Sequence, residues 1–198
     1  MIVVATGFVK GKAVQAKLKS HLKYLVYRPR SPEEKRIDRS LFSKDRSSVP
    51  IKEAYEEILQ HQSEVGFHKL VLSPSCEEYI SDWQQWTRAV MSEWETYKHQ
   101  SLHWYATIHR NTDNPHVHVV VAGSGEDSAG RAKAVRVSRQ DLSFLKTCAH
   151  EHSTSDLSVR EQTIARQILK ELEQEEAEMQ AFTRQIREKR KTSREVGR

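Results

Sequence analysis

Residues 109–121, which read HRNTDNPHVHVVV, decide the fold. On a β-strand, residues two apart point to the same face, so His116 and His118 project side by side, and Val117, Val119 and Val121 face the opposite side. The preceding run, residues 102–109 (LHWYATIH), is also typical of a strand, and the polar hexapeptide between the two runs supplies turn residues. The stretch therefore predicts an antiparallel hairpin in which His109 lies opposite His116.

Strands and helices alternate on both sides of this hairpin. The expected elements are strands at 1–9, 67–72 and 134–137, helices at 11–28, 51–60, 79–94 and 139–150, and a flexible acidic loop at 123–130. The first helix is predicted from one apolar stripe at helical spacing: Val14, Leu18, Leu22 and Leu25. The tryptophans of the third helix also recur at helical spacing, so we expect them to pack in a core rather than stack on bases. This alternation predicts an α+β fold, a central antiparallel sheet with helices packed on it.

The C-terminal part of the chain differs in composition from the rest. From about residue 156 it lacks turn signals and is rich in Glu, Gln, Arg and Lys. Residues 171–178 are acidic and residues 184–194 are basic, a pattern typical of a long solvated helix. We therefore expect a main domain at 1–155 and a charged helical extension at 156–198.

The charge, cysteine content and hydropathy of the chain limit which partners and which cellular compartment are compatible with it. The formal net charge of +5 is compatible with a nucleic-acid partner, although many proteins share such a charge. Cys76 and Cys148 are far apart and in no metal-ligand spacing, which suits a reducing compartment. No run approaches the roughly 20 apolar residues that cross a bilayer. We expect a cytoplasmic protein with no membrane insertion.

Three histidines of the hairpin indicate a metal site. Neutral imidazole nitrogens ligate divalent ions, and His109, His116 and His118 converge on one face of the expected hairpin. A lone histidine on a strand is usually a satisfied surface or core residue, but three together with a valine run behind them favour a ligand set. A structural zinc site would close with four protein ligands. No obvious fourth histidine or cysteine ligand lies nearby in the sequence, so we expect an open coordination position that binds substrate.

The pattern H-x-x-x-D-x-P-H-x-H followed by valines resembles the metal motif of HUH endonucleases. PHVHVVV is most similar to conjugative and mobilisation relaxases, within them to the group that includes the agrobacterial T-DNA nickase. The resemblance implies an HUH relaxase-like α/β sandwich whose three histidines ligate Mg²⁺ or Mn²⁺. Many relatives carry an acidic residue two positions after the first histidine, where this chain has Asn111. Asp113 is expected either to orient a histidine or to serve the turn alone.

The resemblance also implies a tyrosine nucleophile on a helix near the N-terminus. Residues 20–30 read SHLKYLVYRPR, similar to the L-x-Y-L-x-x-R pattern of the T-DNA nickase group, and contain two tyrosines. If the apolar stripe of this helix faces the core, Tyr24 lies about 120° from it and Tyr27 nearly opposite. Tyr24 therefore borders the buried face and is the preferred nucleophile. Tyr27 and His21 are the alternatives, since some mobilisation relaxases are thought to use a histidine.

The implied reaction is a reversible transesterification of DNA. Attack by Tyr24 leaves a 5′-phosphotyrosine and a free 3′-hydroxyl, which can reseal the strand without ATP. A metal ion neutralises charge on the scissile phosphate, and with Arg28 it favours the phenolate over the phenol. Ser73 resembles a serine of the family that contacts DNA near the nick, and it fits the plain end of a strand before Pro74 equally well.

The basic segment after the first helix is the candidate DNA-binding region. Its cations can neutralise phosphates along the strand, and we single out Arg30, Lys35, Arg36 and Arg39. The expected function is a site- and strand-specific relaxase for plasmid mobilisation or conjugation, with residues 1–155 as its catalytic domain. Its partners would be single-stranded DNA at an origin of transfer, accessory relaxosome proteins and a coupling protein.

Three other functions remain open from the sequence. A rolling-circle replication initiator uses the same histidines but places its tyrosine after them, and no tyrosine follows His118 in this chain. A non-catalytic DNA-binding module with a structural metal predicts tight zinc and no covalent adduct with DNA. A hydrolase or oxygenase with a facial triad needs a carboxylate ligand, for which Asp113 is the close candidate.

Overall fold

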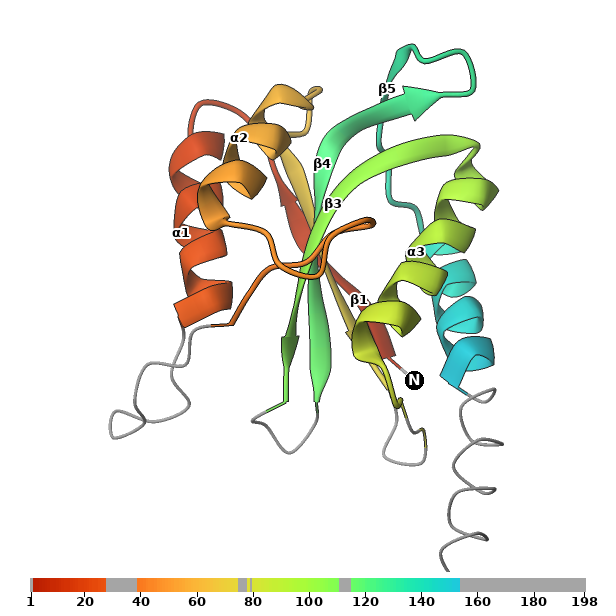
Figure 1. Ribbon diagram of the computed structural model, residues 1–198. Coiled ribbons are helices and arrows are strands. Elements are labelled where there is room, and N and C mark those ends of the chain that lie inside the picture. The colour runs from red at the N-terminus through yellow and green to blue at the C-terminus, as the bar shows by residue number, and fades with distance from the viewer. Residues whose placement is uncertain (1, 28–38, 75–77, 79, 111–114, 154–198) are drawn as a thin grey trace, which may run out of the picture. The chain divides into compact units, whose positions relative to one another are not determined.

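The computed structural model describes residues 2–27, 39–74, 78, 80–110 and 115–153. These form an α+β domain around one antiparallel sheet with the strand order β1-β2-β4-β3, and β5 pairs with the end of β4 (Figure 1). The elements in chain order are β1 Ile2–Val9, α1 Val14–Tyr27, α2 Ile51–Gln60, β2 Phe67–Ser73, α3 Trp83–Lys98, β3 Gln100–His109, β4 His116–Asp127 and β5 Ala132–Ala134. Residues 139–153 are helical as well. The α+β class expected from the sequence is confirmed.

Helices cover both faces of the sheet. In Figure 1, α1 and α2 lie on one side, and α3 and helix 139–153 lie on the other. The central strand β4 is buried on both faces because its valines alternate between two core clusters. Val117, Val119 and Val121 pack with α3 and helix 139–153, whereas Val120 and Ala122 pack with α1 and α2. Val117, Val119 and Val121 thus face away from His116 and His118, as expected from the two-residue period.

Two of the tryptophans of α3 are core residues. Trp86 and Trp94 are 3% and 0% exposed, so neither ring is available to stack on a base. The helix begins later than the sequence predicts, at Trp83 rather than at residue 79, because the Asp82 side chain accepts hydrogen bonds from the backbone N–H groups of Gln84 and Gln85. Core packing was therefore the correct interpretation of the tryptophan spacing.

The prediction of an acidic loop at 123–130 is wrong over most of that range. Strand β4 continues to Asp127, and the turn begins only after it, where the Asp127 side chain accepts hydrogen bonds from two backbone N–H groups. The two glycines that suggested a loop allow close packing. A Cβ on Gly123 would lie 1.6 Å from the carbonyl oxygen of Val65, and one on Gly125 would lie 2.1 Å from that of Ser101. The strand expected at 134–137 lies earlier in the chain, where β5 spans Ala132–Ala134.

The segment before α2 closes the outer edge of β3. Phe42 exchanges both backbone hydrogen bonds with Ala106, and Leu41 pairs with Val49. The expected helical extension at 156–198 lies outside the described residues. Within the described ranges, no helix is long and apolar enough to span a membrane.

Candidate metal centre

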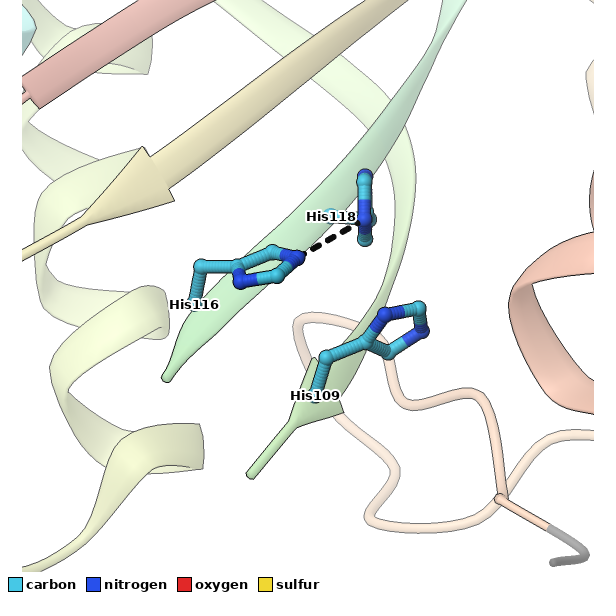
Figure 2. A group of neighbouring side chains, drawn as sticks. All are labelled: His109, His116 and His118. Carbon is cyan, nitrogen blue, oxygen red and sulfur yellow. Dashed lines mark hydrogen bonds between the residues drawn. The ribbon is translucent and has the colours of Figure 1, made fainter. Parts of the chain in front are cut away.

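The three histidines of the hairpin lie at one end of the sheet. His109 is the last residue of β3 and His116 the first of β4, and the two are paired in the strand register. His118 is two residues further along and therefore shares the face of His116. That face is the one covered by α1 and α2. Figure 2 shows the three side chains leaving the two neighbouring strands towards one another.

The spacing of the ring nitrogens fits a single bound ion. The Nε2 atoms of His116 and His118 are 3.1 Å apart, and one nitrogen from each of the three rings lies within 4.8 Å of the others. Two ligands at right angles on a divalent ion, each about 2.1 Å from it, lie about 3.0 Å apart. The donor set of three imidazoles suits a first-row transition ion, and three protein ligands leave positions for a substrate.

A backbone carbonyl of α1 orients the buried histidine. His109 is 6% exposed, and its Nε2–H donates to the carbonyl oxygen of Leu25 over 3.0 Å. A neutral imidazole that donates from Nε2 accepts at Nδ1, so the hydrogen bond selects the nitrogen that would ligate an ion. Leu25 lies in the last turn of α1, where carbonyls have no partner inside the helix. The sequence holds no signal for this contact, because every residue has a carbonyl.

The apolar stripe expected on α1 is buried as predicted. Val14, Leu18, Leu22 and Leu25 all pack in the core with α2 and the sheet. His21, on the adjoining side of the helix, faces β2, with its ring centroid 6.2 Å from that of Phe67. Burial, reinforced by the charge of Lys69, lowers the pKa of His21 to about 4, so its ring is neutral at physiological pH.

The two tyrosines of α1 lie on different sides of the helix. Tyr24 stacks beside His21 at 6.4 Å between ring centroids, on the side of the helix that faces β2, and is 43% exposed. Tyr27 instead lines a pocket with Pro50 and Ile51, on the side that faces α2. Both belong to the half of α1 that ends beside His109, because the Leu25 carbonyl contacts that ring.

Ser73 lies at the same end of the sheet as the histidines. The pairing of β2 with β4 joins Leu72 to Val117, so the next residue of β2, Ser73, lies beside His116. Alternation puts Ser73 on the face of the sheet that carries the histidines. The serine is therefore close in space to the candidate ligands, although 35 or more residues separate them in the sequence.

The remaining candidates are mostly beyond the described ranges. Arg39 is described, and its backbone N–H donates to the carbonyl oxygen of Val26 over 3.3 Å, so Arg39 lies at the C-terminal end of α1. Four other basic candidates and one acidic candidate lie outside the described residues: Arg28, Arg30, Lys35, Arg36 and Asp113.

The sequence model of a protein family described as MobL relaxases matches residues 83–197, more than half of the chain. The matched region runs from α3 through the hairpin and includes His109, His116 and His118. Tyr24 and Ser73 lie before it. No protein of curated function matches the chain.

Proposed function

The chain belongs to the MobL relaxases, and from this premise we propose that it nicks and rejoins single-stranded DNA at an origin of transfer through Tyr24 and a divalent ion held by His109, His116 and His118. The observation that carries the proposal is the convergence of three imidazoles beside the end of the helix that bears the tyrosine. A relaxase role also favours this chemistry over a replication initiator or a purely structural metal.

The metal is Mn²⁺ or Mg²⁺ in this proposal. When bound, it supplies positive charge to the non-bridging oxygens of the scissile phosphate. The protein orients the ligands: His109 is fixed by Leu25, and His116 and His118 by their positions on a strand buried on both faces. These ligands need little rearrangement when an ion binds, which favours a preorganised site.

Tyr24 is the nucleophile in this proposal. Its oxygen forms a bond to phosphorus, the bond from phosphorus to the 3′-oxygen breaks, and the departing oxygen takes up a proton to become the 3′-hydroxyl. The reverse reaction restores the DNA strand and the phenol. The position of Tyr24 supports the assignment, because its side chain is exposed on the side of α1 that faces β2, whose last residue is Ser73. Ser73 would contact DNA next to the nick, with Asp113 and Arg28 as further supporting residues.

DNA recognition is assigned to the basic segment after α1. Arg30, Lys35, Arg36 and Arg39 would neutralise phosphates next to the nucleophile, which makes binding depend steeply on salt. The proposed biological role is plasmid mobilisation or conjugation, with accessory relaxosome proteins and a coupling protein as further partners.

A covalent adduct tests the reaction. The full chain is incubated with single-stranded oligonucleotides that tile the origin region of its own mobile element, with Mn²⁺ or with EDTA, and resolved on a denaturing gel. We expect an adduct that requires Mn²⁺ and is absent from Tyr24→Phe. Tyr27→Phe, on the same helix, is the matched control and should retain it. An adduct that persists in Tyr24→Phe would refute the assignment, and its loss in Tyr27→Phe or His21→Gln would identify the alternative nucleophile.

A further inference from the structure

A second group of metal-ligating side chains lies at the opposite end of the sheet. His61 caps the C-terminal end of α2, His103 lies near the start of β3, and Glu126 lies near the end of β4. One ligand atom from each of the three lies within 4.8 Å of the others. His103 and His109 are six residues apart on one strand, which corresponds to about 20 Å. The group is therefore separate from the candidate centre at His109.

The hydrogen bonds of His103 set which of its nitrogens can ligate a metal. Its Nδ1 lies 3.1 Å from a carboxylate oxygen of Glu57, and the Tyr105 hydroxyl donates to the other oxygen of that carboxylate. Glu57 can only accept, so Nδ1 carries a proton, and in the neutral imidazole Nε2 carries the lone pair. This arrangement, a carboxylate that orients a histidine whose second nitrogen is a ligand, is common around zinc.

The Nε2 atom of His103 is buried, and among the described residues it has no hydrogen-bond partner. Oε1 of Glu126 lies 3.6 Å from it, so in the neutral imidazole a lone pair and a carboxylate oxygen face each other. A direct charge-assisted hydrogen bond would be about 2.8 Å long. Two tetrahedral ligands of one zinc ion, each about 2.1 Å from the metal, lie about 3.4 Å apart. The observed separation is close to the spacing across a shared cation.

His61 completes the ligand set. Its ring stacks on that of His103 with 3.5 Å between centroids and 14° between planes. Two rings ligate one ion only when their planes meet at it, so the His61 ring would have to leave this stack, by rotation about its Cα–Cβ bond, to aim a nitrogen at the space between His103 and Glu126. The two carboxylates of the group, Glu57 and Glu126, together bring a formal charge of about −2 when ionised, which favours a cation.

We propose that His61, His103 and Glu126 form a second metal site, which binds Zn²⁺ and in which Glu57 is a positioning residue. Two imidazoles and one carboxylate are a known zinc donor set, with water in the fourth position. His103 and Glu57 also line a pocket with Ser43 and Lys44, next to this group. The site would tie the end of α2 to strands β3 and β4, so zinc would stabilise the fold by binding the native state alone.

Zinc content tests this site without reliance on nicking. The full chain carrying His116→Ala and His118→Ala, which disables the first centre, is loaded with Zn²⁺, dialysed and analysed for metal by mass spectrometry. We expect one zinc ion per chain and a higher melting temperature with zinc than without it. Adding Glu126→Gln should remove the bound zinc and the shift in melting temperature. Adding Glu57→Gln should weaken zinc binding by about 10-fold to 100-fold.

Matched controls separate the site from general effects of charge or histidine content. Glu64→Gln changes an exposed carboxylate three residues from His61, and His99→Asn changes an exposed histidine at the end of α3. Both should leave the zinc content at one per chain. Absence of stoichiometric zinc in the starting variant would overturn the proposal, as would zinc that survives Glu126→Gln. Circular dichroism of each variant establishes that a loss of zinc does not follow from unfolding.

Discussion

Replacement of Asp141 by asparagine is expected to lower the free energy of unfolding by about 3 kcal/mol. The Asp141 carboxylate is 5% exposed and pairs with the Lys98 ammonium at 2.8 Å. It also accepts hydrogen bonds from the Trp94 indole N–H at 2.9 Å and from the backbone N–H of Ser138 at 2.7 Å. These contacts join helix 139–153 to α3.

The magnitude follows from the burial of the partner that remains. Removing one member of a buried ion pair costs about 3–5 kcal/mol, because the other charge is left uncompensated. Lys98 is 15% exposed and also donates to the carbonyl oxygen of Arg136 at 2.9 Å, so the lower end of this range applies.

The same contacts predict how the loss depends on pH. Burial raises the pKa of Asp141, but hydrogen bonds from Lys98, Ser138 and Trp94 outweigh it and lower the pKa from 3.8 to about 2. A depressed carboxyl pKa stabilises the fold above the unfolded value and ceases to do so as the pH falls through the folded value. About 2 kcal/mol of the difference between the parent and Asp141→Asn should therefore vanish between about pH 4 and about pH 2.

Urea unfolding followed by tryptophan fluorescence measures both quantities, at pH 7 and at steps down to pH 2. Asp45→Asn, which changes an exposed aspartate, is the control and should alter stability by less than about 0.5 kcal/mol. A loss below about 1 kcal/mol at pH 7 would refute the ion-pair reasoning. A loss that stays constant down to pH 2 would refute the assignment of the depressed pKa to Asp141.

Three further predictions concern packing, protonation and metal. Gly123→Ala should destabilise the domain by about 3 kcal/mol, because its Cβ would meet the Val65 carbonyl, whereas Gly130→Ala, with a φ of 71° and open space around it, should cost about 1 kcal/mol in urea unfolding. The pKa of His21 falls from 6.5 to about 4 on folding, so stability should decrease as pH is lowered through that interval. A His21→Leu variant should show a weaker dependence of stability on pH. An unchanged dependence would contradict the assignment of the lowered pKa to His21. EDTA should abolish nicking while the far-ultraviolet circular dichroism at 25 °C stays constant, because the paired strands hold the histidines without an ion; collapse of the spectrum would show that the metal is needed to fold.

Local periodicity was sufficient to predict most elements of the fold. Helix α2 has the bounds expected from the sequence, and the register that joins His109 to His116 follows from a short hairpin between two strands. The prediction that the apolar stripe of α1 is buried is confirmed for the same reason, because residues on the buried face of a helix recur about every 3.6 positions. The signals in these cases come from neighbouring residues.

Features made by distant residues could not be predicted. Gly123 and Gly125 are typical of a loop, yet here they permit close backbone approach within a strand, and the groups they approach belong to other parts of the chain. His61, His103 and Glu126 form no sequence motif, because a helix end and two strands bring them together. The Leu25 carbonyl that orients His109 is equally invisible in the sequence.

In the proposed mechanism, the hydrogen bond from His109 to Leu25 would connect the binding of metal with the binding of DNA. The carbonyl belongs to the same helical turn as Tyr24, so a movement of α1 that adjusts the tyrosine on DNA also moves the group that holds a metal-site histidine. Thermodynamic linkage then makes the effect reciprocal: the factor by which the ion tightens the protein's hold on DNA equals the factor by which DNA tightens its hold on the ion. If that factor exceeds one, a relaxase that works as proposed would retain its metal best while it is engaged with its strand, and would release it most readily after the strand has left.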